Sequence, residues 1–87
     1  MSNQKVLLVD SDTKSQRVLE VSLKKAGFEV ATARNIEDAQ LAALASPPDV
    51  IVTEADFPVG SGFDLCRRLR DDTRTAGVAV VFLAQDG

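Results

Sequence analysis

The chain has 87 residues and a formal net charge of −3, and hydrophobic residues make up 45% of it. This size fits a single domain with a thin core, so we treat residues 1–87 as one domain. The absence of histidine excludes imidazole triads and imidazole metal sites, and a lone cysteine, Cys66, excludes an internal disulfide. The acidic balance argues against nucleic-acid binding, and no apolar run approaches the ~18 residues of a membrane span. One free thiol and an N-terminus without a signal-peptide pattern predict the cytoplasm.

The first half of the chain alternates strand and helix patterns. Lys5–Val9 is a short apolar run, typical of a strand that is buried on both faces of a parallel sheet. Asp12 or Thr13 is predicted to cap a helix that runs to Ala26. Phe28–Thr32 alternates large apolar residues with polar or small ones, which predicts a less buried edge strand.

The first predicted helix has two distinct sides on a helical wheel. We expect its apolar stripe to face the sheet and its polar stripe to face solvent. The apolar stripe is Val18, Leu19, Leu23 and Ala26, and the polar stripe is Gln16, Arg17, Glu20 and Lys24.

The second half continues the alternation. Asn35 is a good N-cap for a helix over Ile36–Ala45, and Val50–Thr53 is predicted as the third strand. Phe63–Arg70 is predicted as the third helix and Val78–Leu83 as the fourth strand. The side chains expected to face inward are Ile36, Ala39 and Ala43 on the second helix, and Phe63, Cys66 and Leu69 on the third.

The β-α-β-α-β-α-β order predicts an α/β fold with a parallel sheet, helices on both faces and right-handed crossovers. Ligands of such sheets lie beyond the carboxyl ends of the strands. Asp10 and Asp12 follow the first strand, and Glu54 and Asp56 follow the third, so carboxylates could converge there and hold Mg²⁺. The alternative interpretation is that these acids are solvated loop residues or helix caps.

Several segments, taken together, resemble a bacterial response-regulator receiver domain. Val6–Asp12 resembles the start of the family's domain, and Ala26–Val30 resembles the end of its first helix and its second strand. Pro48–Glu54, Gly62–Arg70 and Val80–Leu83 resemble its third strand, third helix and fourth strand. The resemblance covers nearly all 87 residues. It implies a flavodoxin-like, doubly wound sheet of order 2-1-3-4-5, truncated here to four strands and three helices.

The sequence departs from the family at the residues that do its chemistry. The resemblance assigns Glu54 to the position of the phospho-accepting aspartate, and Asp10 to the first of two metal-binding acids. Ser11 stands where the second acid is expected, and Ala84 where a switch hydroxyl is expected. The backbone carbonyl of Asp56 matches the family's main-chain metal ligand. The family's lysine and aromatic switch residue belong beyond residue 87.

These departures predict a pseudo-receiver, which is a non-enzymatic module of a two-component or phosphorelay system that acts without phosphorylation. We expect Mg²⁺ to bind weakly or not at all, with Asp10, Glu54 and Asp56 as the candidate ligands. The expected partners are other proteins or a histidine kinase, and an output domain beyond Gly87 in a longer parent protein. One alternative is a receiver that can still be phosphorylated in the presence of Mg²⁺. Two weaker ones are an independent Mg²⁺-dependent hydrolase and a Glu54 side chain that mimics the phosphorylated state.

The fourth predicted strand ends the recognisable pattern. Val78–Leu83 has the composition of a strand buried on both faces, yet it would form an exposed edge of the sheet. We therefore expect either that these residues are part of a longer polypeptide or that the chain associates with itself through this strand.

Overall fold

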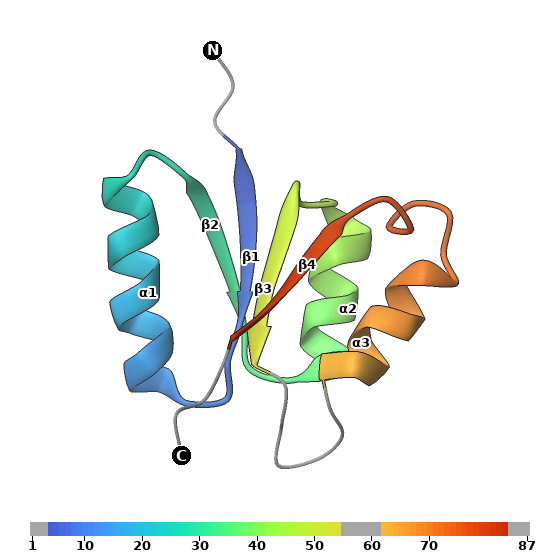
Figure 1. Ribbon diagram of the computed structural model, residues 1–87, viewed down its shortest axis with the longest axis horizontal. Coiled ribbons are helices and arrows are strands. Elements are labelled where there is room, and N and C mark those ends of the chain that lie inside the picture. The colour runs from blue at the N-terminus through green and yellow to red at the C-terminus, as the bar shows by residue number, and fades with distance from the viewer. Residues whose placement is uncertain (1–3, 55–61, 84–87) are drawn as a thin grey trace.

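The computed structural model describes residues 4–54 and 62–83 of the chain (Figure 1). All seven predicted elements are present, with strand and helix bounds close to those expected from the sequence. They are β1 (Lys5–Val9), α1 (Thr13–Lys25), β2 (Glu29–Ala33), α2 (Ile36–Ala45), β3 (Val50–Glu54), α3 (Gly62–Arg70) and β4 (Ala79–Leu83).

The four strands form one parallel sheet in the order β2-β1-β3-β4. Its register places Leu8 of β1 beside Thr32 of β2 and Val52 of β3. Helix α1 lies alone on one side of the sheet, whereas α2 and α3 lie on the other (Figure 1). This arrangement follows from right-handed crossovers, because the chain moves outward from β1 to β2 and then returns past β1 to β3 and β4. The predicted doubly wound parallel fold is confirmed.

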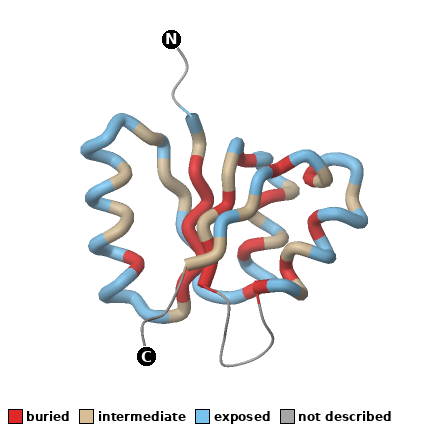
Figure 2. The backbone as a smooth tube through the Cα atoms, viewed as in Figure 1, coloured by how far each residue is buried: buried red, intermediate tan, exposed pale blue. Residues whose placement is uncertain are grey.

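The main core lies between the sheet and the pair α2 and α3. The sheet contributes Leu7, Val9 and Ile51, and α3 contributes Leu65 and Leu69, all of them buried (Figure 2). The predicted inner face of α2 is confirmed, since its three members lie in the same cluster. They are Ile36, Ala39 and Ala43.

Local hydrogen bonds set the ends of the helices. The side chain of Asn35 accepts a hydrogen bond from the Asp38 backbone N–H at 2.8 Å, which confirms its prediction as the α2 cap. Asp12 is the N-cap of α1. Beyond the other end of α1, Gly27 has φ of +99°, a left-handed conformation that glycine adopts without strain.

The prediction for the two sides of α1 is confirmed only in part. Arg17 and Lys24 are exposed as expected, but the predicted apolar side is not the buried one throughout, since Ala26 is exposed. Val18 is 66% exposed, and Gln16, which was assigned to the solvent side, is only 8% exposed. Leu19 and Leu23 are half-buried, so the buried side runs through Gln16, Leu19 and Leu23. The reason is that among the described residues no second helix lies beside α1, so the side that carries Val18 is left uncovered.

The predicted inner face of α3 is also confirmed in part, since Leu69 is buried and Cys66 is half-buried. Phe63 is 61% exposed, whereas Leu65, which was not assigned to the core, is fully buried. The helix begins at Gly62, which is buried and packs against the end of β3. The Phe63 ring stacks instead on Phe82 of β4, with 4.6 Å between the ring centroids. No helix in the described residues is long and apolar enough to cross a membrane.

Candidate functional site

Two carboxylates meet at the carboxyl end of the sheet. Asp10 directly follows β1, and Glu54 is the last residue of β3, the strand that pairs with β1. Both are buried, with 5% of each residue exposed. The structure thus brings together two of the acids that the sequence placed at this edge, because parallel neighbouring strands end at the same side of a sheet.

Backbone N–H groups hold both of these carboxylates. The Ser11 backbone N–H donates to Oε1 of Glu54 at 2.7 Å, and the Asp12 backbone N–H donates to Oδ1 of Asp10 at 2.9 Å. The turn between β1 and α1 therefore supplies one donor to each acid. A carboxylate that accepts such a hydrogen bond is fixed in orientation.

The side chain of Asp12 serves the helix instead of the acid pair. It is exposed, and its Oδ1 accepts a hydrogen bond from the Lys14 backbone N–H at 3.0 Å. Its Oδ2 accepts another from the Ser15 hydroxyl at 3.3 Å. The helix-cap interpretation therefore describes the hydrogen bonds of the Asp12 side chain. Its assignment to the acidic pocket stays a prediction.

Two predicted site positions, Asp56 and Ala84, lie outside the described residues. The main-chain metal ligand at Asp56 and the missing switch hydroxyl at Ala84 therefore stay predictions.

Burial raises the pKa of Asp10 above its ordinary value of 3.8. The hydrogen bond from the Asp12 backbone opposes this shift, while the nearby carboxylates of Glu54 and Asp12 add to it. The end of the sheet is therefore a place where added negative charge is unfavourable.

Mg²⁺ requires near-octahedral oxygen ligands, usually including one or two carboxylates. Among the described residues no three acidic, cysteine or histidine side chains are grouped so that they could hold a metal ion. Asp10 and Glu54 remain as a pair, and Oε1 of Glu54 already accepts the Ser11 N–H. Within the described residues the buried acidic side chains at this end of the sheet are therefore the pair Asp10 and Glu54 alone, and weak binding of Mg²⁺ stays a prediction.

Sequence reasoning missed Gln16 as part of this edge. Its Nε2 donates to the carbonyl of Ala33 at 2.8 Å and lies 3.4 Å from the carbonyl of Asp10. It thereby links α1 to the carboxyl ends of β1 and β2. The spacing in the sequence could have identified it. Gln16 lies three residues before Leu19 and seven before Leu23, and this spacing places all three on one side of the helix.

The start of α3 packs tightly against the end of β3. A Cβ added at Gly62 would lie 2.5 Å from the carbonyl oxygen of Glu54 and 2.9 Å from Cε1 of Phe82. Glycine is therefore required for this close approach, which brings the N-terminus of α3 beside the strand that carries Glu54.

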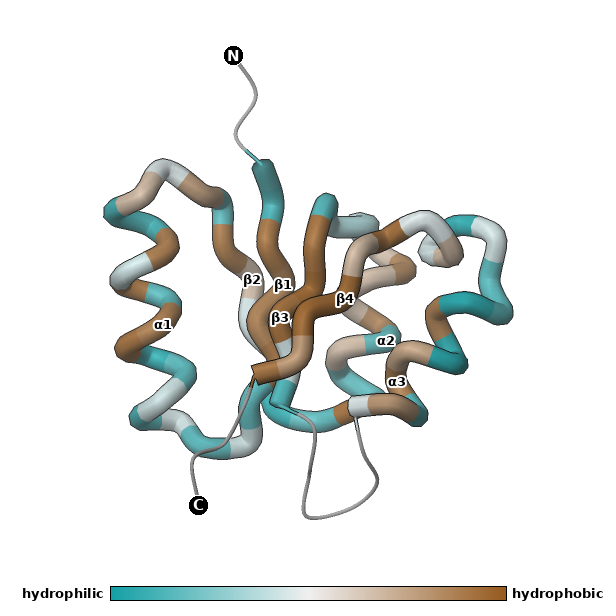
Figure 3. Tube along the Cα trace, viewed as in Figure 1, coloured by the Kyte–Doolittle hydropathy of each residue, from teal (hydrophilic) through white to brown (hydrophobic). Residues whose placement is uncertain are grey.

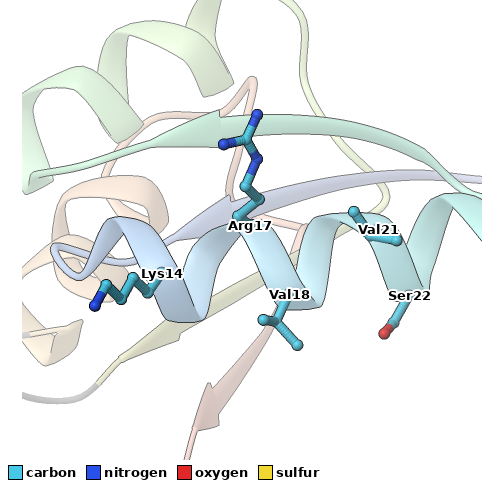
Figure 4. A pocket seen from close by; sticks show the side chains of 5 residues that line it. All are labelled: Lys14, Arg17, Val18, Val21 and Ser22. Atoms are coloured by element: carbon cyan, nitrogen blue, oxygen red, sulfur yellow. The ribbon is translucent and has the colours of Figure 1, made fainter.

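A separate shallow hollow lies on the surface of α1, lined by Lys14, Arg17, Val18, Val21 and Ser22 (Figure 4). Its lining combines two cationic side chains with two valines and contains no acid. It is distinct from the Asp10 and Glu54 pair and shares no residue with it.

Comparison with known proteins agrees with this geometry. The family model described as the response regulator receiver domain matches residues 6–87. The chain is 30% identical over 87 residues to the phosphate regulon transcriptional regulatory protein PhoB of Pseudomonas aeruginosa, covering 100% of this chain and 38% of that protein. It is 36% identical over 84 residues to the response regulator PleD of Caulobacter vibrioides, covering 95% of this chain and 18% of that protein. The chain thus spans less than two fifths of either relative.

Solved structures support the same fold. The chemotaxis response regulator CheY4 of Vibrio cholerae superposes with a TM-score of 0.91 at 27% identity, covering 98% of this chain and 71% of that one. The N-terminal domain of a response regulator receiver protein from Methanoculleus marisnigri gives a TM-score of 0.92 at 25% identity, covering 98% and 69%.

Proposed function

Because this chain belongs to the response regulator receiver family, we propose that it is a receiver domain that regulates its partners without being phosphorylated. Receiver domains are signalling modules that interact with histidine kinases and with output domains in longer proteins. This chain spans only 38% of PhoB, so the functions of the whole relative do not transfer to it directly. We include in the proposal that it interacts with a histidine kinase, that it regulates an output domain in a longer protein, and that it acts in the cytoplasm.

The hydrogen bond between Ser11 and Glu54 is the observation that supports this proposal most directly. Glu54 occupies the position that the family resemblance assigns to the phospho-acceptor, and its Oε1 accepts the Ser11 N–H at 2.7 Å. Phosphoryl transfer requires the attacking oxygen to lie in line with the leaving group, and a misplacement of about 1 Å lowers the rate by about 100-fold. Glutamate is one methylene longer than aspartate, and here its carboxylate is held toward the β1–α1 turn.

Charge at the site supports the same conclusion. An acyl phosphate on Glu54 would carry about 1.5 to 2 negative charges in place of the one on the carboxylate, so it would add about 0.5 to 1 negative charge next to Asp10. Asp10 is buried, and its raised pKa shows that negative charge is already disfavoured there. Serine at position 11 supplies no carboxylate for a cation that could neutralise this charge.

Incubation with acetyl phosphate and Mg²⁺, followed by intact mass spectrometry, tests the proposal. We expect no phosphoryl adduct on the natural chain and none on Glu54→Asp alone, because the metal site stays incomplete. The double variant Ser11→Asp/Glu54→Asp should gain a detectable, hydroxylamine-sensitive adduct. A phosphoryl adduct on the natural chain would favour the alternative function, a phosphorylatable Mg²⁺-dependent receiver.

Calorimetric titration with Mg²⁺ tests the metal part separately. We expect only weak binding, in the millimolar range or above, since two carboxylates remain and one of them is engaged by Ser11. Ser11→Asp should tighten the binding. Sub-millimolar, stoichiometric binding to the natural chain that Asp10→Ala removes would contradict this expectation.

A further inference from the structure

A small polar hollow lies between α1 and the end of β2. Its volume is about 220 Å³, and it is lined by Thr13, Gln16, Arg17, Glu20 and Arg34. Figure 3 shows strongly hydrophilic residues where α1 begins and where β2 passes into α2. These elements lie at the β2 edge of the sheet, which is the edge opposite to β4. The hollow is thus formed within residues 4–54, which the structure describes without a gap.

Two arginines from different elements line this hollow. Arg17 lies on α1, Arg34 directly follows β2, and both are exposed. Figure 4 shows the Arg17 side chain pointing to the opposite side of α1 from Val18, away from the apolar part of the other hollow. Among the described residues, neither guanidinium makes an ion pair or a hydrogen bond to another protein group. Both groups are therefore available to a ligand.

The one acid in the lining is already engaged. Oε2 of Glu20 lies 2.9 Å from Nζ of Lys24. Together with Lys24, the charged residues of the lining are three cations and one acid, which gives a formal charge of +2. The chain as a whole has a formal charge of −3. The hollow is therefore a local reversal of the charge of the chain.

A buried hydrogen bond fixes the backbones of the two arginines relative to one another. Gln16, which is 8% exposed, directly precedes Arg17, and Ala33 directly precedes Arg34. Nε2 of Gln16 donates to the carbonyl of Ala33 at 2.8 Å. The same carbonyl accepts the Asp10 backbone N–H at 3.1 Å. Because this junction is already ordered, a ligand has to order only the two arginine side chains.

We propose that this hollow binds a small phosphate dianion through Arg17 and Arg34. The planar guanidinium group presents parallel N–H donors that match the oxygens of phosphate, and two such groups balance a dianion. The hydroxyl of Thr13 is a further donor in the lining. The volume of the hollow is below the roughly 300–1,000 Å³ of sites for drug-sized ligands, so the ligand is small.

This site is separate from the pair of Asp10 and Glu54, since neither acid lines the hollow. It does not depend on whether Glu54 accepts a phosphoryl group. Because both guanidinium groups are exposed, each ion pair contributes little, and binding should be in the millimolar range.

Titration with inorganic phosphate, followed by NMR at constant ionic strength in a chloride background, tests the proposal. Near pH 8 phosphate is mostly the dianion, and the side-chain N–H signals of Arg17 and Arg34 report on binding directly. We expect both signals to shift and to saturate, and acetate, which carries one charge, to bind at least fivefold more weakly. Shifts that do not saturate, or equal affinity for acetate, would overturn the proposal.

Variants that change one charge each test which residues hold the anion. Arg17→Gln and Arg34→Gln should each weaken phosphate binding at least threefold, and Glu20→Gln should tighten it. Arg68→Gln is the matched control, because it removes the same charge from α3, where Arg68 is bonded to the neutral Gln40. The control should leave the affinity unchanged. Equal weakening by Arg68→Gln and Arg34→Gln would show that phosphate responds only to the net charge of the chain, and would overturn the site.

Gln16→Met separates the position of the arginines from their charge. It keeps every charge in the hollow but removes the hydrogen bond to the Ala33 carbonyl, so phosphate binding should weaken at least twofold. Circular dichroism shows whether this variant is folded under the conditions of the titration. An unchanged affinity in the folded variant would contradict the role of the junction in placing the two arginines.

Discussion

On one face of the sheet α2 and α3 bury Leu7, Val9 and Ile51, whereas on the other face α1 lies alone and Val81 stays half exposed (Figures 1 and 2). Within the described residues, α1 contributes a single buried side chain, Gln16. The α2–α3 face therefore provides most of the hydrophobic stabilisation, and the α1 face is joined to the sheet by fewer contacts.

The residues of the candidate site belong to the α1 face. Side chains alternate along a strand, so Leu8 and Asp10 point to one side of the sheet, and Val52 and Glu54 point to that same side. The acid pair thus ends rows of side chains in which Leu8 of β1 is fully buried, whereas Val52 of β3 is only half-buried. Stability and the candidate site are separated between the two faces, and substitutions can test this separation.

The largest difference is expected between a core leucine and a surface valine. Leu65→Ala on the α2–α3 face removes a fully buried side chain and should lower the free energy of unfolding by about 2–5 kcal/mol. Val21→Ala on α1 should change it by less than about 0.5 kcal/mol. Urea denaturation followed by circular dichroism, at one fixed protein concentration, measures both.

If Leu65→Ala does not fold, Ile51→Val tests the same face with an expected loss of about 0.5–1.5 kcal/mol. Equal effects of the core and surface substitutions would show that the two faces do not differ in their contribution to stability.

A smaller effect is expected where α3 meets β3. Gly62→Ala should destabilise the chain by about 1–3 kcal/mol, because the new Cβ would meet the Glu54 carbonyl oxygen at 2.5 Å and the backbone must shift. Gly77→Ala is the matched control, since nothing lies within 4 Å of its added Cβ. The control should be neutral or stabilising by about 0.4–1 kcal/mol. Thermal denaturation of the two variants side by side makes the measurement, and similar midpoints would contradict the close contact.

The attachment of α1 should depend on a polar contact. Gln16→Met keeps the length of the side chain but removes the donor to the Ala33 carbonyl, and should lower the free energy of unfolding by about 1 kcal/mol. Gln40→Met is the control, because its hydrogen bond to Arg68 is exposed and should contribute less than about 0.5 kcal/mol. Urea denaturation compares them, and a larger effect at Gln40 would show that the α1 face does not rely on Gln16.

Most of the fold follows from the sequence because its strands are apolar runs and its helix ends carry clear caps. Lys5–Val9 and Asn35 are examples, and both predictions are confirmed. The meeting of Asp10 and Glu54 also follows, because parallel strands that are neighbours end together.

What the sequence could not predict depends on contacts between distant segments. The side of α1 that is buried depends on which elements pack against it. The apolar residue Val18 predicts a buried position in either case, because the sequence pattern does not reveal whether a second helix lies beside α1. The role of Gln16 depends on two backbone carbonyls that only the folded sheet brings near its amide. The hydrogen bond from Ser11 to Glu54 likewise joins residues that are 43 positions apart.

The smallest expected effect depends on pH and concerns the polar end of the α1 face. The native pKa of Asp10 is raised above its ordinary 3.8, mainly by burial, so ionisation of Asp10 destabilises the fold as pH rises through the native value. Asp10→Asn keeps an acceptor for the Asp12 N–H and should stabilise the chain at pH 7, by less than about 1 kcal/mol. The gain should vanish near pH 3, where the natural carboxyl is protonated in both the folded and the unfolded state.

Urea midpoints of the natural chain and Asp10→Asn at both pH values make this measurement. A double-mutant cycle with Glu54→Gln isolates the repulsion between the two acids, because the glutamine side chain can still accept the Ser11 N–H but carries no charge. In that background the gain from Asp10→Asn at pH 7 should be smaller, since the repulsion from the Glu54 carboxylate is gone and the burial of Asp10 remains. A gain of the same size at pH 3 and pH 7 would mean that the amide packs better than the carboxyl, and that charge at the end of the sheet has little influence on stability.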